Sequence, residues 1–101
     1  MAIEIDREVT HSLGQAEALQ RIKGLLERLQ REHADKVSIE AQVWQGHRGQ
    51  FRVNILGYLI QGRIMVLDDK VKFRGGSQLA PDKMQSQVDD LLHQQVEKLL
   101  A

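Results

Sequence analysis

The chain has 101 residues, of which 42% are hydrophobic and 28% charged, with a formal net charge of zero and no cysteine. This composition predicts a single α+β domain over residues 1–101, and it excludes a disordered chain, a disulfide framework and thiolate metal sites. Residues 1–6 lack a basic and apolar leader, and no apolar run approaches the roughly 18 residues of a membrane span. The sequence therefore favours a cytoplasmic protein without a membrane span.

The first third of the chain predicts a short strand followed by one amphipathic helix. Two isoleucines alternate with acidic residues over residues 2–7, as in a half-buried strand. Ser12 with Gln15 three residues later matches a capping box, so we expect the helix to begin there. Apolar residues then recur every three or four positions through about Glu32. Gly24 falls inside this helix, where it weakens the helix relative to alanine.

From Val37 the apolar period changes to two, which predicts four consecutive strands ending near Arg74. A glycine-containing loop at residues 45–49 and a tight turn at residues 68–69 separate strands, and residues 75–77 are expected to end the sheet. The residues predicted to face the core are Val37, Ile39, Ala41, Val43, Phe51, Val53, Ile55, Ile60, Gly62, Ile64, Val66, Val71 and Phe73.

The last quarter of the chain predicts a second helix. Pro81 suits the first helical position, and Leu79 is placed to pack against Met84 as a hydrophobic staple. Together the segments predict an α+β fold in the order β-α-β-β-β-β-α. In this fold two helices pack on one face of a curved antiparallel five-stranded sheet, an arrangement that resembles that of the TATA-binding protein.

Motifs for catalysis or metal binding are lacking in this sequence. The four histidines, at positions 11, 33, 47 and 93, have no metal-ligand spacing and suit solvent-exposed positions. The serines lack a nucleophile motif, and the paired glycines suit turns better than phosphate cradles. We therefore expect no cofactor, no metal site and no catalytic residue.

The sheet face turned away from the helices is the one candidate surface. Strand alternation predicts that it carries Glu40, Gln42, Trp44, Arg52, Asn54, Gln61, Arg63, Met65, Lys72 and Arg74. Trp44 stands opposite in register to the apolar residues of its strand, and tryptophan is enriched at interfaces. The alternatives are that Trp44 caps the core and that the polar residues form an ordinary solvated face. The candidate interaction residues are Trp44, Arg52, Arg63, Lys72 and Arg74.

Charge argues against a dedicated nucleic-acid binder. Residues 37–76 hold six Lys/Arg against three Asp/Glu, an excess of +3, but the flanking segments are acidic and the whole-chain pI is about 6.9. A nucleic-acid-binding domain typically has a pI above about 9. Weak, salt-sensitive nucleic-acid binding remains an alternative.

Several short motifs in this order resemble one bacterial family. They are Ile3-x-Ile5, His11-x-Leu13, Trp44-x-Gly46, Phe51 and Gly62-x-Ile64-x-Val66, followed by an apolar helix. This combination, over essentially the full chain, is similar to the small polyhydroxyalkanoic acid system proteins, also called the polyhydroxyalkanoate granule region family. The family usually has an acidic residue after Trp-x-Gly, where this chain has His47. The resemblance implies association with storage-polyester granules and implies no catalytic residue.

The sequence thus predicts a non-enzymatic accessory protein that docks a protein partner or the granule surface through the exposed sheet face. A small-ligand-binding module or small enzyme, with a pocket between sheet and helices, is the alternative from another class. Self-association is a further expectation, as a homodimer through an edge strand over residues 37–44.

Overall fold

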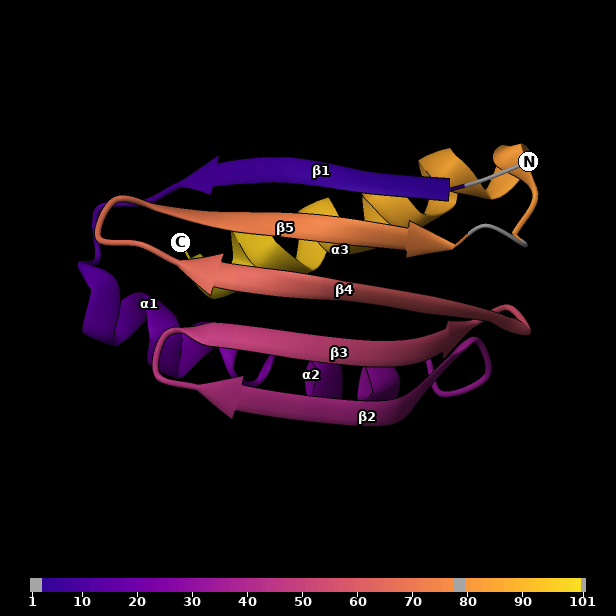
Figure 1. Cartoon of the computed structure of the whole chain (residues 1–101), viewed down its shortest axis with the longest axis horizontal. Helices are drawn as coiled ribbons and strands as arrows, with labels where there is room; N and C mark the ends of the chain where they lie inside the picture. Colours follow the sequence, from indigo (N-terminus) through magenta and orange to yellow (C-terminus); the bar gives the residue numbers. More distant parts are fainter. Residues whose placement is uncertain (1–2, 78–79, 101) are drawn as a thin grey trace.

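Five antiparallel strands form one open sheet in the order β1-β5-β4-β3-β2 (Figure 1). The computed structural model describes residues 3–77 and 80–100. The predicted order β-α-β-β-β-β-α is confirmed, with the first helix divided into two. The elements are β1 (Ile3–Thr10), α1 (Gln15–Ile22), α2 (Leu25–Glu32), β2 (Val37–Gln45), β3 (Arg48–Ile55), β4 (Tyr58–Val66), β5 (Lys70–Ser77), the 3₁₀ turn η1 (Asp82–Met84) and α3 (Gln85–Leu100).

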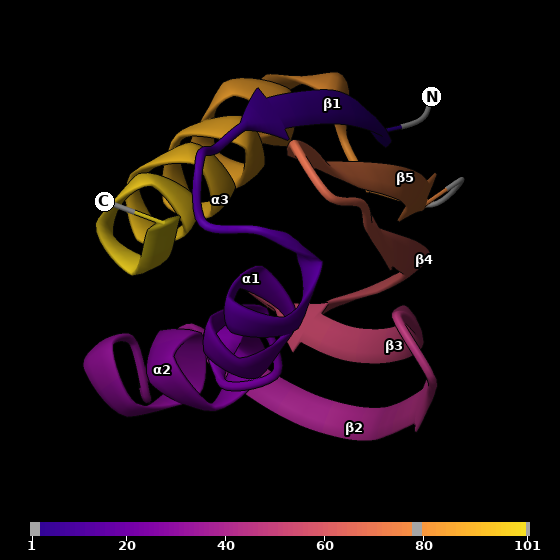
Figure 2. The same ribbon diagram turned by 90° about the vertical axis from the view of Figure 1, so that its left-hand side faces the viewer.

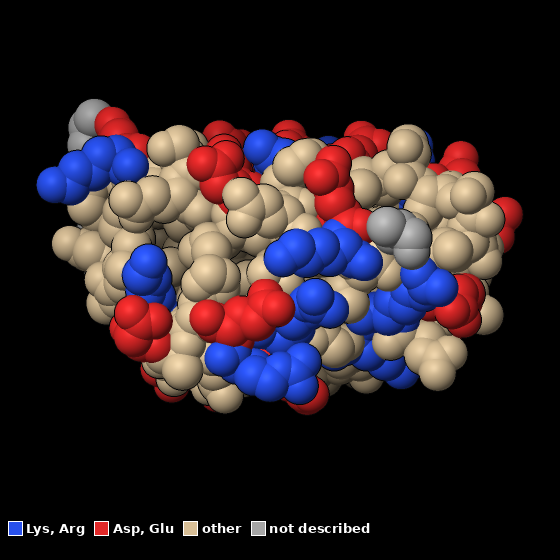
Figure 3. Space-filling model, turned by 180° about the vertical axis from the view of Figure 1, so that it is seen from behind, with Lys and Arg blue, Asp and Glu red and all other residues tan. Residues whose placement is uncertain are grey.

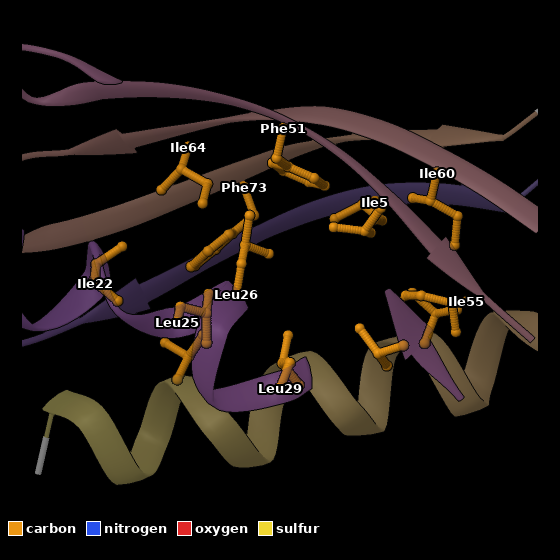
Figure 4. Close-up of a cluster of buried hydrophobic side chains, with 14 of the residues drawn as sticks. Ile5, Ile22, Leu25, Leu26, Leu29, Phe51, Ile55, Ile60, Ile64 and Phe73 are labelled. Carbon is orange, nitrogen blue, oxygen red and sulfur yellow. The ribbon is translucent and has the colours of Figure 1, made fainter. Parts of the chain in front are cut away.

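All helices lie on one side of the sheet, which curves around them (Figure 2). Apolar side chains of the sheet, such as Phe51, Ile64 and Phe73, point toward Leu25 and Leu26 of α2 (Figure 4). Phe73 is 1% exposed and is one of the largest side chains that are fully buried. The side of the sheet that carries no helix is called the outer face below, and the side that packs on the helices is the inner face.

The first helix differs from the sequence prediction at both its start and its middle. Gly24 N–H donates to Arg21 O at 3.2 Å, and this tight turn separates α1 from α2. The helix begins at Gln15 after Gly14, whose φ is 82°, so the predicted capping by Ser12 is wrong. The N–H of Gln15 instead donates to the Asp68 carboxylate, at 3.3 Å. A residue from the β4–β5 turn thus replaces the local cap.

A β-bulge in β2 changes which of its side chains face the core. Ile39 pairs with Val53, but the next paired residue is Ala41, opposite Arg52, so Glu40 is an extra residue. Side chains beyond the bulge exchange faces because alternation restarts after it. The prediction that Ala41 and Val43 face the core is therefore wrong, and Val43 is 57% exposed on the outer face.

The sheet is also longer at its ends than predicted. β1 continues to Thr10, and β5 continues through Ser77 instead of ending near Arg74. Gly75 pairs with Ile5 on one side and with Gly62 on the other, so the glycines belong to the ladder. Pro81 precedes the 3₁₀ turn, and the α-helix itself starts at Gln85. The predicted staple by residue 79 lies outside the described residues.

The β3–β4 hairpin contains a residue that is unfavourable for its turn. Leu56 and Gly57 both have positive φ, 54° and 89°, as a two-residue type I′ turn requires. Leucine resists this conformation, whereas asparagine adopts it more readily. We expect Leu56→Asn to raise the free energy of unfolding by about 0.5–1 kcal/mol, since Leu56 is 41% exposed and loses little packing.

Urea unfolding monitored by circular dichroism measures this effect. The backbone hydrogen bond from Leu56 N–H to Lys36 O is kept in every variant at this position. Leu56→Ala is the control, because alanine removes the same side chain without the preference for positive φ, and we expect it to bring no gain. A Leu56→Asn protein no more stable than Leu56→Ala contradicts the prediction.

Candidate interaction surface

Four cations from three neighbouring strands share the outer face. Arg52 comes from β3, Arg63 from β4, and Lys72 and Arg74 from β5. The pairing register places them on one side because Arg52 is opposite Gln61, Arg63 is opposite Arg74 and Lys72 is opposite Met65. We call Arg52, Arg63, Lys72 and Arg74 the basic face. The sequence predicted that these four residues share a face, and the structure brings them together.

The basic face borders an open depression of about 1110 Å³ on the outer face. Its floor includes Gly62 and Gly75, a cross-strand pair without side chains. Two residues that line the depression, Ala41 and Val43, were not predicted there, because the bulge in β2 was not foreseen from the alternation of the strand. The depression is lined by Ala41, Val43, Gln50, Phe51, Arg52, Gln61, Gly62, Arg63, Met65, Lys72, Arg74 and Gly75.

Like charges face each other within this surface. Arg63 and Arg74 are directly opposite in the β4–β5 ladder, an arrangement that is unfavourable without a counter-charge. Arg74 has Asp6 of β1 at 3.7 Å, but both side chains are mostly exposed, so this pair contributes little. The outer positions of β3 and β4 carry Arg48, Gln50, Arg52, Asn54, Leu59, Gln61, Arg63 and Met65 and hence no carboxylate. An anionic partner group would therefore complement this part of the sheet.

Trp44 does not belong to the basic face, and its predicted place on the outer face is wrong. The bulge at Glu40 turns Trp44 to the inner face, where its ring covers Gly49 and packs against the core. A Cβ on Gly49 would lie 2.9 Å from the indole carbons. The indole Nε1–H donates to Gln42 Oε1 at 3.1 Å. Of the alternatives for Trp44, the structure shows the one in which it caps the core.

The space between sheet and helices is small. The interior void bounded by Leu25, Phe51, Phe73 and other apolar residues measures about 30 Å³. A water molecule needs roughly 10–15 Å³ and a small-molecule site about 300 Å³ or more. This void therefore has no room for the ligand pocket that the alternative function requires.

The helix side of the molecule carries both signs of charge. Figure 3 shows Lys and Arg interspersed with Asp and Glu over this side. Arg21 lies 3.1 Å from Glu17, and Arg28 lies 3.7 Å from Glu32. The helix side shown there therefore mixes both signs, whereas the outer positions of β3, β4 and β5 carry cations and no carboxylate.

Two of the four histidines, His11 and His93, make side-chain contacts with other elements or within their helix. His11 Nε2 donates to Leu67 O at 3.1 Å, while its Nδ1 accepts from Leu13 N–H at 3.2 Å. His93 Nδ1 lies 3.1 Å from Arg7 Nη1, and His93 Nε2 lies 2.9 Å from Glu97 Oε1. Over residues 3–77 and 80–100, no group of three His, Asp or Glu is placed to hold a metal ion. Within the same ranges, no helix has the length and hydropathy needed to cross a membrane.

These features define a small α+β protein with an open sheet face that is basic over β3, β4 and β5, and a helical side that carries charges of both signs. The family model described as "Putative polyhydroxyalkanoic acid system protein" matches residues 3–100. The chain therefore belongs to this family, and the resemblance seen in the sequence is confirmed. No curated protein and no solved structure matches the chain significantly. The likeness to the TATA-binding protein accordingly stays a prediction.

Proposed function

We propose that the protein is a non-enzymatic, cytoplasmic accessory protein of the polyhydroxyalkanoic acid system that docks an acidic protein partner through the basic face. Family membership supports the system. The main observation in support of this docking surface is that Arg63 of β4 lies directly opposite Arg74 of β5. The outer positions of β3 and β4 hold no carboxylate that could compensate this pair. Folding alone does not favour such an arrangement, whereas a partner carboxylate would relieve it.

The shape of the surface favours a macromolecular partner over a small molecule. The depression of about 1110 Å³ is open to solvent, with cations at its margin and glycine backbone at its floor. An enclosed pocket buries most of a small ligand, whereas an open basic surface suits a complementary acidic surface. Arginine also forms paired hydrogen bonds with carboxylates, which gives a protein partner both orientation and specificity.

Two other occupants fit the charges less well. A polyester surface has no net charge to complement four cations. The continuous charge of a nucleic-acid backbone would extend past the basic strands onto the outer carboxylates of β1, Glu4, Asp6 and Glu8, whereas an acidic patch on a protein can be confined to β3, β4 and β5. The chain as a whole is also neutral. An acidic protein remains the best electrostatic match.

Charge reversal on the basic face tests this proposal. We expect Arg52→Glu with Arg63→Glu to lower capture of the partner from lysates of polyester-storing cells about tenfold or more, because repulsion replaces attraction at the docking surface. The control is Lys23→Glu with Arg31→Glu, which makes the same change in net charge at exposed positions of the helical side. Bound proteins are identified by mass spectrometry, and circular dichroism checks folding.

Each other outcome contradicts part of the proposal. Unchanged capture by the Arg52→Glu, Arg63→Glu protein excludes the basic face as the docking site. Equal loss in both variants shows a dependence on net charge alone. Binding of the unaltered chain to protein-free polyester granules, lost in the Arg52→Glu, Arg63→Glu protein, identifies the granule surface as the occupant. Binding to DNA or RNA that falls steeply with salt identifies a nucleic acid.

A further inference from the structure

Both edge strands of the sheet are partly covered by glutamine side chains from the helices. Gln85 of α3 accepts a hydrogen bond from Glu4 N–H at 2.8 Å and donates one to Glu4 O at 2.7 Å, on the edge of β1. Gln30 of α2 accepts from Ile39 N–H at 2.8 Å, on the edge of β2. These amides occupy the backbone groups that a further strand would use, so they protect those parts of the sheet.

The second half of β2 lacks the residues that usually protect an edge strand. Beyond the bulge at Glu40, residues 41–45 read Ala-Gln-Val-Trp-Gln, with neither a charge nor a proline. Charged residues and proline are the residues with which proteins usually protect a free edge strand. Val43 in the middle of this segment is 57% exposed, the higher value of the two large hydrophobic residues exposed in the described chain. We call residues 41–45 the open edge.

The hairpin fixes which backbone groups of the open edge point outward. Gln45 and Arg48 flank the two-residue turn Gly46–His47 and form its closing pair. Residues alternate along an antiparallel ladder, so Val43 directs its N–H and C=O toward β3. Gln42 and Trp44 then direct theirs away from β3. The open edge therefore presents two residues whose backbone donors and acceptors face outward.

We propose that a second copy of the chain pairs with the open edge, antiparallel, with Val43 on the two-fold axis. In this register Gln42 of one copy exchanges backbone hydrogen bonds with Trp44 of the other, and the symmetry repeats the exchange. Val43 meets the second Val43 in a pair without hydrogen bonds, where side chains approach most closely. Ala41 lies opposite Gln45 of the second copy. An uncharged, self-complementary segment suits a second copy because a two-fold axis places the same patch on both partners.

This pairing would join the two sheets into one. Ala41 and Val43 line the outer depression, so the two-fold axis at Val43 would lie at the margin of this depression. The two basic faces would then lie on one continuous surface. The segment is short, and an interface of this size gives a reversible, concentration-dependent dimer. The inference stands on the β2 edge and does not require the acidic partner proposed above.

Single cysteines test the register, because the natural chain has none. We expect Val43→Cys to form a disulfide-linked dimer under mild oxidation, since residues opposite each other without hydrogen bonds have Cα atoms about 4.5 Å apart. Ala41→Cys and Gln45→Cys are the controls. In this register each lies about 13 Å from its own copy along the strand, too far for a disulfide. A mixture of these two variants is expected to form the crossed disulfide.

Sedimentation velocity without a crosslink tests the interface itself. The mean mass of the unaltered chain is expected to rise with concentration. Val43→Asp should abolish this rise by opposing two carboxylates, whereas Val43→Thr should retain it. A chain that stays monomeric, or Ala41→Cys crosslinking as efficiently as Val43→Cys, overturns the inference. The Arg52→Glu, Arg63→Glu protein is expected to dimerise normally, so failure of the dimer and failure of the docking surface are separable.

Discussion

Replacing Gly75 with valine is expected to lower the free energy of unfolding by more than about 3 kcal/mol, enough to unfold much of the protein. A Cβ at this position would overlap the carbonyl oxygen of Gln61 and lie 2.5 Å from the Cα of Gly62. Both atoms belong to the backbone of β4 and cannot turn aside. The strands would have to separate at the centre of the sheet, which breaks ladder hydrogen bonds on both sides of the pair.

Urea unfolding of alanine variants measures the close approach with a smaller change. Gly75→Ala is compared with Gly24→Ala, where the nearest atom to the new Cβ is Arg21 O at 3.7 Å, an ordinary contact. Gly24 has φ −90°, which alanine also adopts. We expect Gly24→Ala to be neutral or stabilising and Gly75→Ala to be strongly destabilising. Similar stabilities for the two variants contradict the close approach of the strands.

The same glycine pair shapes the candidate surface. Gly62 and Gly75 line the floor of the outer depression between cations of the basic face. Both glycines share a row with Ile5 and Phe51, so a side chain at either position would point to the inner face, and it is their backbone that borders the depression. Substitutions at these positions therefore test the packing of the sheet, and docking experiments are best made with the exposed cations.

Trp44→Ala is expected to lower the free energy of unfolding by about 2–3 kcal/mol while leaving partner capture unchanged. The indole is half-buried, packs against the core and covers Gly49, so its loss exposes apolar surface on the inner face. The basic face lies on the other side of the sheet. Urea unfolding gives the stability, and the lysate capture described above gives the docking at a temperature where the variant is folded.

Gly49→Val tests the contact between the Trp44 ring and Gly49 by a second measurement. Trp44 is the only tryptophan, so its fluorescence reports directly on its surroundings. A valine side chain at position 49 would displace the ring, and we expect a shift of emission to longer wavelength together with lower stability. Gln45→Val is the control, because residue 45 lies on the outer face of the same hairpin. Loss of capture by folded Trp44→Ala protein would place Trp44 in the interface instead.

Much of the sheet follows from apolar periodicity alone. β3, β4 and β5 keep an unbroken alternation at Phe51 to Ile55, Ile60 to Val66 and Val71 to Phe73, so counting every second residue assigns their faces correctly. This is also why Arg52 and Arg63 were predicted to share a face. Family membership was likewise recognisable from motifs spread over the chain.

β2 shows where this reasoning fails. One extra residue at Glu40 reverses every later side chain, and no composition signal in the strand marks it. Trp44 was therefore expected at the interface and Val43 in the core, the opposite of their positions. The sequence does contain one hint, since Gly49 opposite Trp44 leaves space for a large ring on the inner face.

The amino-acid sequence by itself determined the element order, the core of the unbulged strands and the four cations of the basic face, because each depends on spacing between near neighbours. The tertiary structure alone decided the contacts between distant residues. Asp68 caps α1, Gln30 and Gln85 cover the sheet edges, and Gly62 meets Gly75. Such contacts have no local period, since their energy arises only once the sheet has brought the partners together.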